Sequence, residues 1–82
     1  MGAHIANEFP ELSALTADEI TATLSASRLS ATDREIAAQR LIWRMPYIDI
    51  AVAHNYDRST VAKRMRRIIV PALITIAKRK TA

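Results

Sequence analysis

Apolar residues recur along most of this chain at intervals of three and four, the spacing of one face of an α-helix. The first helix is predicted from about Ala17 to Ala26. Thr16-Ala17-Asp18-Glu19 forms a capping box, in which the threonine hydroxyl and the glutamate carboxylate satisfy backbone N–H groups at the helix start. Thr32-Asp33-Arg34-Glu35 repeats this pattern and predicts a second helix, which should end before Pro46. The apolar face of that second helix is expected to contain Ile36, Ala37, Leu41 and Met45.

Two further helices are predicted on either side of a tight turn. Pro46 disfavours helical backbone at the residue before it and can open the next helix, so we expect a short helix from Tyr47 to His54. Asn55 tolerates the left-handed conformation and can reverse the chain there. Asp57 then stands as the N-cap of a helix that starts at Arg58. The core side of this helix is expected to contain Val61, Met65, Ile68 and Ala72.

The segment from Ile68 to Ala77 is apolar on nearly all sides and must be buried somewhere. Pro71 either kinks one long helix or begins a separate one. Three kinds of burial remain open: folding back onto the N-terminal helix, pairing with a second copy, or lying on a membrane surface. The segment is too short to span a bilayer, and we expect no membrane partner. The candidate dimer or partner surface consists of Ile48, Val52, Ile69, Leu73, Ile74 and Ile76.

Composition narrows the fold class. The chain has 82 residues, enough for one domain, and its single Gly and three Pro argue against a turn-rich β architecture. Because there is no Cys, disulfide scaffolds and thiolate metal sites are excluded. We therefore expect an all-α, compact domain of four to five helices over residues 16–82, after an N-terminal tail or arm over residues 1–15. No signal peptide is apparent, and a cytoplasmic location is expected.

Charge is unevenly distributed along the chain. Residues 1–30 contain four acids and one base, whereas residues 31–82 contain eleven bases and four acids. From Asn55 onward there are eight bases and one acid, Asp57. A basic half on a small helical domain is typical of nucleic-acid binding proteins. A solvated basic helix face with no such role is the alternative interpretation.

Residues 46–69 have the pattern of a helix-turn-helix motif. Ala51 occupies the position where the two helices touch, Asn55 the turn, and Val61 the inward position of the second helix. Tyr47-Ile48-Asp49-Ile50-Ala51 and Ser59-Thr60-Val61-Ala62-Lys63-Arg64-Met65 together resemble region 4 of bacterial sigma factors, the part that reads promoter DNA.

This resemblance covers about Leu29 to Ile69, half of the chain. His54 departs from it at a position usually taken by Leu, and Asn55 departs from it where Gly is usual. The first thirty residues do not resemble the polymerase-binding region of a full sigma factor. The resemblance therefore implies a small sigma-like regulator of a bacterium, a phage or a mobile element, located in the nucleoid or in a phage-infected cell.

In a helix-turn-helix the second helix enters the major groove. The expected base-reading residues are Arg58, Ser59, Ala62, Lys63 and Arg66. The expected phosphate contacts are Arg40, Arg44, Tyr47, Thr60 and Arg67. Arg64 is expected to run along the core edge to solvent rather than to read a base. The partners are then double-stranded DNA, with a homodimer and RNA polymerase as further candidates.

Catalysis has little support in the sequence. His54, with Asp49 and Asp57 nearby, suggests a base or metal ligand, but a partly buried turn histidine is the simpler interpretation. We expect no enzyme activity, no cofactor and no metal site. Two other functions compete with DNA reading: a protein-interaction module, and RNA or non-specific nucleic-acid binding. Trp43, Tyr47 and Tyr56 are interpreted as core and backbone-contact residues rather than as a stacking platform for RNA bases.

Overall fold

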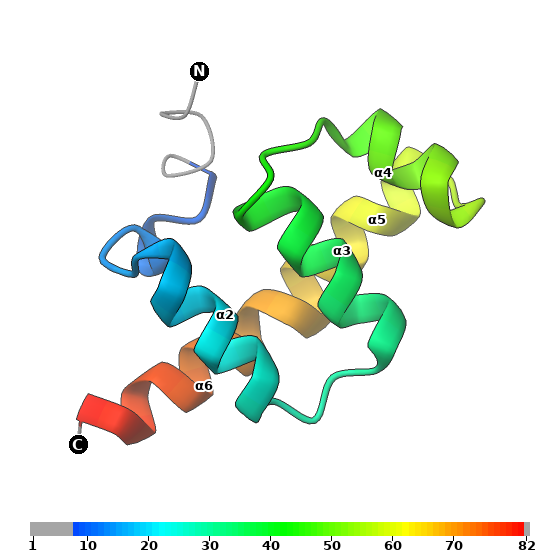
Figure 1. Cartoon of the computed structure of the whole chain (residues 1–82). Helices are drawn as coiled ribbons and strands as arrows, with labels where there is room; N and C mark the ends of the chain where they lie inside the picture. Colours follow the sequence, from blue (N-terminus) through cyan, green and yellow to red (C-terminus); the bar gives the residue numbers. More distant parts are fainter. Residues whose placement is uncertain (1–7, 82) are drawn as a thin grey trace.

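The computed structural model describes residues 8–81, with side chains as far as Arg79, and this part of the chain is all-α and compact (Figure 1). A short 3₁₀ turn, η1, precedes the helices. A π-helical turn, η2, joins the last two helices into one continuous helical stretch. The elements are η1 (Pro10–Leu12), α2 (Ala17–Ala26), α3 (Ala31–Leu41), α4 (Tyr47–His54), α5 (Arg58–Arg64), η2 (Met65–Ile69) and α6 (Val70–Thr81).

The two predicted capping boxes have different outcomes. At α2 the prediction is confirmed: Glu19 N–H donates to the Thr16 hydroxyl at 3.1 Å, and Thr16 N–H donates to the Glu19 carboxylate at 2.9 Å. At α3 the prediction is wrong, because Ser30 is the N-cap and its hydroxyl accepts from Asp33 N–H at 3.1 Å. Thr32 therefore lies inside the helix, which begins two residues earlier than the second box implies.

The segment between α3 and α4 is longer than the sequence predicts. Helix α3 ends at Leu41, so Met45 is outside the helix that was expected to contain it. Arg44 adopts a φ of 58°, a conformation that a non-glycine residue rarely adopts. The reversal lets Met45 N–H donate to Gln39 O at 2.9 Å, and Pro46 then becomes the N-cap of α4. Four residues, 42–45, therefore separate the end of α3 from the proline at which the helix was expected to end.

The π turn changes which residues of the last helices face the core. Val70 N–H donates to Met65 O, five residues back. Each residue of this wider turn therefore rotates the chain about the helix axis by a smaller angle than in an α-helix. Ile69 is fully buried as a result, whereas Ile68, the expected core residue, is 43% exposed. Pro71 follows directly. A proline ring in a regular α-helix collides with the carbonyl oxygen four residues earlier. At Pro71 that carbonyl lies in the wider π turn, so the helix continues without a break.

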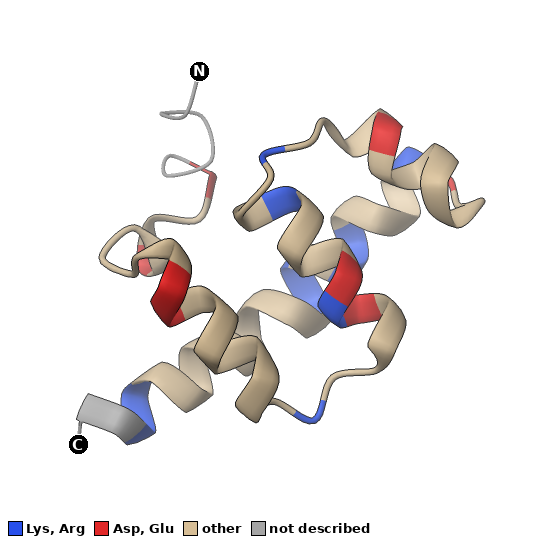
Figure 2. Ribbon diagram, viewed as in Figure 1, with Lys and Arg blue, Asp and Glu red and all other residues tan. Residues whose placement is uncertain are grey.

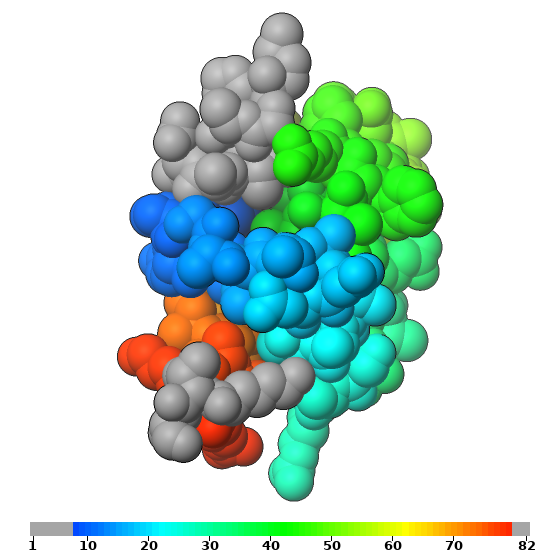
Figure 3. Space-filling view, turned by 60° about the vertical axis from the view of Figure 1, so that its left-hand side comes forward, coloured from blue at the N-terminus to red at the C-terminus, as the bar shows by residue number. Residues whose placement is uncertain are grey.

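Helix α2 lies over α6 and beside α3 in the space-filling view (Figure 3). The buried cluster that forms the core includes residues of all three helices. Leu73 of α6 is fully buried in it, so the C-terminal segment folds back onto the N-terminal helix. This corrects part of the expected partner surface: Ile69 and Leu73 are core residues, while Ile74 and Ile76 are only partly buried.

The N-terminal segment also contributes to the core. The sequence analysis assigns residues 1–15 to a tail or arm, and residues 1–7 lie outside the described part. Phe9 and Leu12 are each 5% exposed and belong to the same buried cluster as the helices. Leu15 packs against that cluster. The packed domain therefore begins before residue 16, because two large apolar side chains of the supposed tail are removed from water.

Candidate nucleic-acid interface

Helices α4 and α5 pack closely on either side of a three-residue turn. Asn55 has the predicted left-handed conformation, with φ 57° and ψ 41°. Tyr56 N–H then donates to Ala51 O at 2.8 Å, a hydrogen bond typical of a helix that ends in a left-handed residue. Ala51 is 2% exposed, and Ile50 and Val61 are fully buried. Asp57 is the N-cap residue of α5, as expected, but its side chain makes no capping hydrogen bond.

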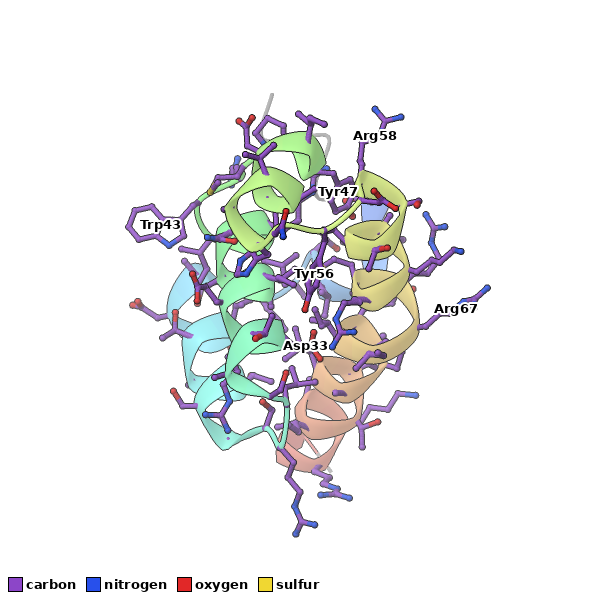
Figure 4. All side chains as sticks on the ribbon, turned by 90° about the vertical axis from the view of Figure 1, so that its right-hand side faces the viewer. Asp33, Trp43, Tyr47, Tyr56, Arg58 and Arg67 are labelled. Atoms are coloured by element: carbon purple, nitrogen blue, oxygen red, sulfur yellow. The ribbon has the colours of Figure 1, made fainter. Side chains whose placement is uncertain are left out.

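The outward face of α5 and η2 is basic. Arg58 and Arg67 both point away from the body of the protein (Figure 4). Within the described residues, no hydrogen bond or ion pair involves the side chains of Arg58, Lys63, Arg66 and Arg67. The expected base-reading residues Arg58, Ser59, Lys63 and Arg66 are exposed, whereas Ala62 and the flanking Thr60 are partly buried.

The acidic residues of α2 lie on a different side of the molecule from this face (Figure 2). The outward positive charge of α5 is therefore not neutralised by the acids of α2. Such a separation leaves a local positive potential that attracts polyanions. Arg44, also exposed, lies in the segment before α4 and remains accessible for a phosphate contact.

Arg64 belongs to a different environment from its neighbours. Its guanidinium makes two hydrogen bonds to the Asp33 carboxylate, at 2.7 and 3.0 Å, and lies 5.9 Å from the centre of the Tyr56 ring. The hydrogen bond to Asp33 raises the pKa of Arg64 above its ordinary value. Arg64 thus turns inward, and its charge is used to join α5 to α3.

Asp33 is the partner that sequence reasoning missed, because it was assigned to a capping box. Its side chain is only 6% exposed. A signal was available: Asp33 lies three and four residues before Ile36 and Ala37, so it shares their inward helix face. A carboxylate on a buried face requires a basic partner, although its position along the chain does not identify that partner.

Arg40 does not lie on an open surface as expected for a phosphate contact. Its guanidinium is paired with the Glu8 carboxylate at 3.2 Å and lies 4.1 Å above the Tyr47 ring. Tyr47 is itself partly buried. Neither residue is open to a phosphate in this arrangement. The reason is again tertiary: Glu8 comes from the N-terminal segment, 32 residues away along the chain.

His54 has the environment of a structural histidine. Its Nε2 atom lies 2.9 Å from Gln39 Oε1 and 3.9 Å from a Glu35 carboxylate oxygen, and its ring stacks on that of Tyr56. No group of three or more His, Asp or Glu residues in the described part could hold a metal ion.

Three large apolar side chains in the described part of the chain are more than half exposed. Ile48 and Val52, neighbours on α4, are 54% and 75% exposed. Trp43 is 72% exposed, so it is not a core residue, whereas a contact to the nucleic-acid backbone stays a prediction. It points away from the molecule on the opposite side from Arg67 in Figure 4. The exposed part of the expected partner surface is therefore on α4 rather than on the C-terminal helix.

No helix in the described part of the chain is both long and apolar enough to cross a membrane. No protein-family model matches this chain, and neither the curated proteins nor the solved structures provide a significant match to it. Function therefore has to be inferred from the geometry of the chain itself.

Proposed function

We propose that this domain is a sequence-specific DNA-binding transcription regulator that inserts α5, starting at Arg58, into the major groove. The sigma-like pattern of residues 46–69 suggests this role. The packing of α4 on α5 across the Asn55 turn supports it, since this arrangement presents one face of α5 to solvent. The single observation that carries the proposal is that the outward basic side chains of α5 and η2 have no acidic partner among the described residues, while Arg64 is paired inward.

Each residue type on this face suits a particular contact. Arg58 and Lys63 can donate to O6 and N7 of guanine, and the arginine fork can do so with two hydrogen bonds. Ser59 can pair with either base type, Ala62 can touch a thymine methyl group, and Arg66 extends the base-reading row. Thr60, Arg67 and Arg44 are suited to phosphates, which fix the position of the protein on the duplex.

The test begins with selection from a random duplex pool at two salt concentrations. The proposal expects a defined sequence to survive the higher salt, whereas enrichment of no sequence would contradict specific reading. Inverted half-sites in the selected sequence would indicate the homodimer.

The matched variants are Lys63→Ala with Arg66→Ala, and Arg28→Ala with Arg79→Ala. Each pair removes two exposed positive charges, but the second pair lies off α5. We expect the first pair to weaken binding to the selected duplex roughly 100-fold without loss of thermal stability, because two base contacts disappear. The second pair should weaken binding only a few-fold. Equal losses would mean that net charge alone binds DNA.

A second candidate function is a protein-interaction module, with RNA polymerase as one candidate partner and DNA contact secondary or absent. The observation in its favour is the exposure of Ile48 and Val52 on α4. Transcription from a promoter that carries the selected sequence separates the two functions. A DNA reader loses activity when Lys63 and Arg66 are substituted. An interaction module loses activity with Ile48→Ser and Val52→Ser but tolerates substitution of the two basic side chains.

A further inference from the structure

Arg40 is held in a fixed orientation near the end of α3. Its Nη1 donates to Met45 O at 2.8 Å, and its guanidinium centre lies 4.1 Å from the centre of the Tyr47 ring. Its Nε and Nη2 atoms both donate to Glu8 Oε1 at 3.2 Å. The carbonyl and the ring therefore set the orientation of the guanidinium. The edge that carries Nε and Nη2 is directed at the Glu8 carboxylate.

This anion lies close to the surface. The side chains of Arg40 and Glu8 are 14% and 21% exposed, so the pair is covered but not sealed from solvent. An arginine edge that meets one carboxylate oxygen with two N–H groups presents the geometry that also binds a phosphate oxygen. The carboxylate occupies the position that such an oxygen would take.

The Tyr47 ring lies against the Arg40 guanidinium, and the Glu8 carboxylate also influences the ionisation of its hydroxyl. Burial, together with hydrogen bonding and charge from Glu8, raises the pKa of Tyr47 to about 12. The hydroxyl is therefore protonated at neutral pH and remains a neutral hydrogen-bond donor. A site that contains a fixed guanidinium and a protonated phenol is suited to a phosphate.

We infer that Arg40 and Tyr47 form a binding site for a backbone phosphate of DNA, which the Glu8 carboxylate occupies as an internal competitor. This inference rests on the proposed function. Phe9 and Leu12 are buried in the core directly after Glu8, so the carboxylate is tethered at high effective concentration. A DNA phosphate must displace Glu8, and Glu8 lowers the affinity for DNA.

The first experiment compares Glu8→Gln with Glu11→Gln on one selected duplex. Both variants remove one negative charge from the same segment, but Glu11 is exposed and outside the Arg40 site. We expect Glu8→Gln to bind roughly fivefold more tightly. The slope of log K against log salt should steepen by about 0.9, which corresponds to one additional phosphate contact. An equal gain in both variants would overturn the inference, because it would be an effect of net charge.

Adding Arg40→Gln to Glu8→Gln should remove the gain, and persistence of the gain would contradict the site. Arg40→Lys replaces Arg40→Gln if the latter does not fold, since lysine keeps the charge but cannot offer the two-donor edge. Thermal unfolding of every variant establishes that the native domain is being compared.

A second experiment uses inorganic phosphate and does not depend on DNA. Titration of Glu8→Gln, followed by the NMR signal of the Arg40 Nε–H group, should show a saturable shift that is absent in the wild-type protein. A lack of saturable shift in the variant overturns the site. If the shift occurs and no variant binds DNA, the proposed function fails and the phosphate site stands. If DNA binding is intact without the shift, only the inference fails.

Discussion

Lys63 and Arg64 are adjacent in α5 and lie in opposite environments. Lys63 is exposed and has no ion-pair partner in the described part of the chain, whereas Arg64 makes two hydrogen bonds to the nearly buried Asp33. Both residues carry one positive charge, so composition does not distinguish them. Their roles differ because one step along a helix rotates a side chain by about 100°. One face of α5 is joined to α3 by this ion pair, and the other face remains accessible to a partner.

Ile68 and Ile69 show the same contrast for apolar residues. Ile69 is fully buried and Ile68 is 43% exposed, although both are isoleucines in one turn. The π turn decides between them, since it displaces the core position by one residue. An inward and an outward side of one continuous helix therefore explain both pairs of neighbours.

The largest expected effect tests this register directly. Ile69→Ala should lower the free energy of unfolding by about 3 kcal/mol, because it removes buried methylene groups and leaves a cavity. This corresponds to a fall of roughly 10–20 °C in Tm for a domain of this size. Ile68→Ala, the matched control, should change stability by no more than about 0.5 kcal/mol. Equal losses in thermal or urea unfolding would mean that the helix has no π register shift.

The next effect concerns the inward ion pair. Asp33→Ala should lower the free energy of unfolding by about 2 kcal/mol, below the usual cost of breaking a buried pair, because water can partly solvate Arg64. The Arg64 side chain is 32% exposed. Asp49→Ala removes the same charge from an exposed position on α4 and serves as the control. If urea titration gives the two variants the same midpoint, the pair does not stabilise the fold.

The smallest effect is a pH dependence that arises at Tyr47. Its pKa is 10.0 in the unfolded chain and about 12 in the folded protein. The stabilisation is therefore complete below about pH 10 and is lost as pH rises towards 12, because the unfolded state releases its proton first. Partial solvent exposure reduces the expected loss to about 1 kcal/mol.

Tyr47→Phe provides the control, because it removes this ionisation and leaves that of Tyr56. Urea unfolding at about pH 9 and about pH 12 should show a smaller difference for the variant than for the wild-type protein. An identical difference in both proteins would place the alkaline loss of stability elsewhere.

Much of the helical framework was predictable from the sequence. The bounds of α2 and α4, the Thr16 capping box and the left-handed Asn55 all agree with the structure. These features depend on residues within one or two turns of each other, and local preferences are sufficient to specify them. The exposure of Lys63 and Arg66 was predictable for the same reason, since helical spacing places them away from Val61 and Met65.

Other features were not predicted, and they have a local and a tertiary cause. The Ser30 cap was missed because two overlapping hydroxyl patterns compete locally, and the packing of Asp33 against α5 accompanies the earlier start. The inward pairing of Arg40 was missed because its partner, Glu8, lies in a segment that the sequence analysis treats as a tail. The phosphate contact of Arg40 stays a prediction. For Asp33 and Arg40, a partner more than thirty residues away along the chain decides what the side chain contacts.

The sequence by itself determined that this protein is helical, the bounds of α2 and α4 and the start of α5, and that its second half is basic. Hydrogen bonding and side-chain spacing within a few residues encode these properties. Only the tertiary structure decided which basic side chains point outward and that Arg40 and Arg64 turn inward. It also decided that the C-terminal helix packs against α2. Burial makes each charge depend on a partner brought close by folding, and that proximity is not encoded in the local pattern.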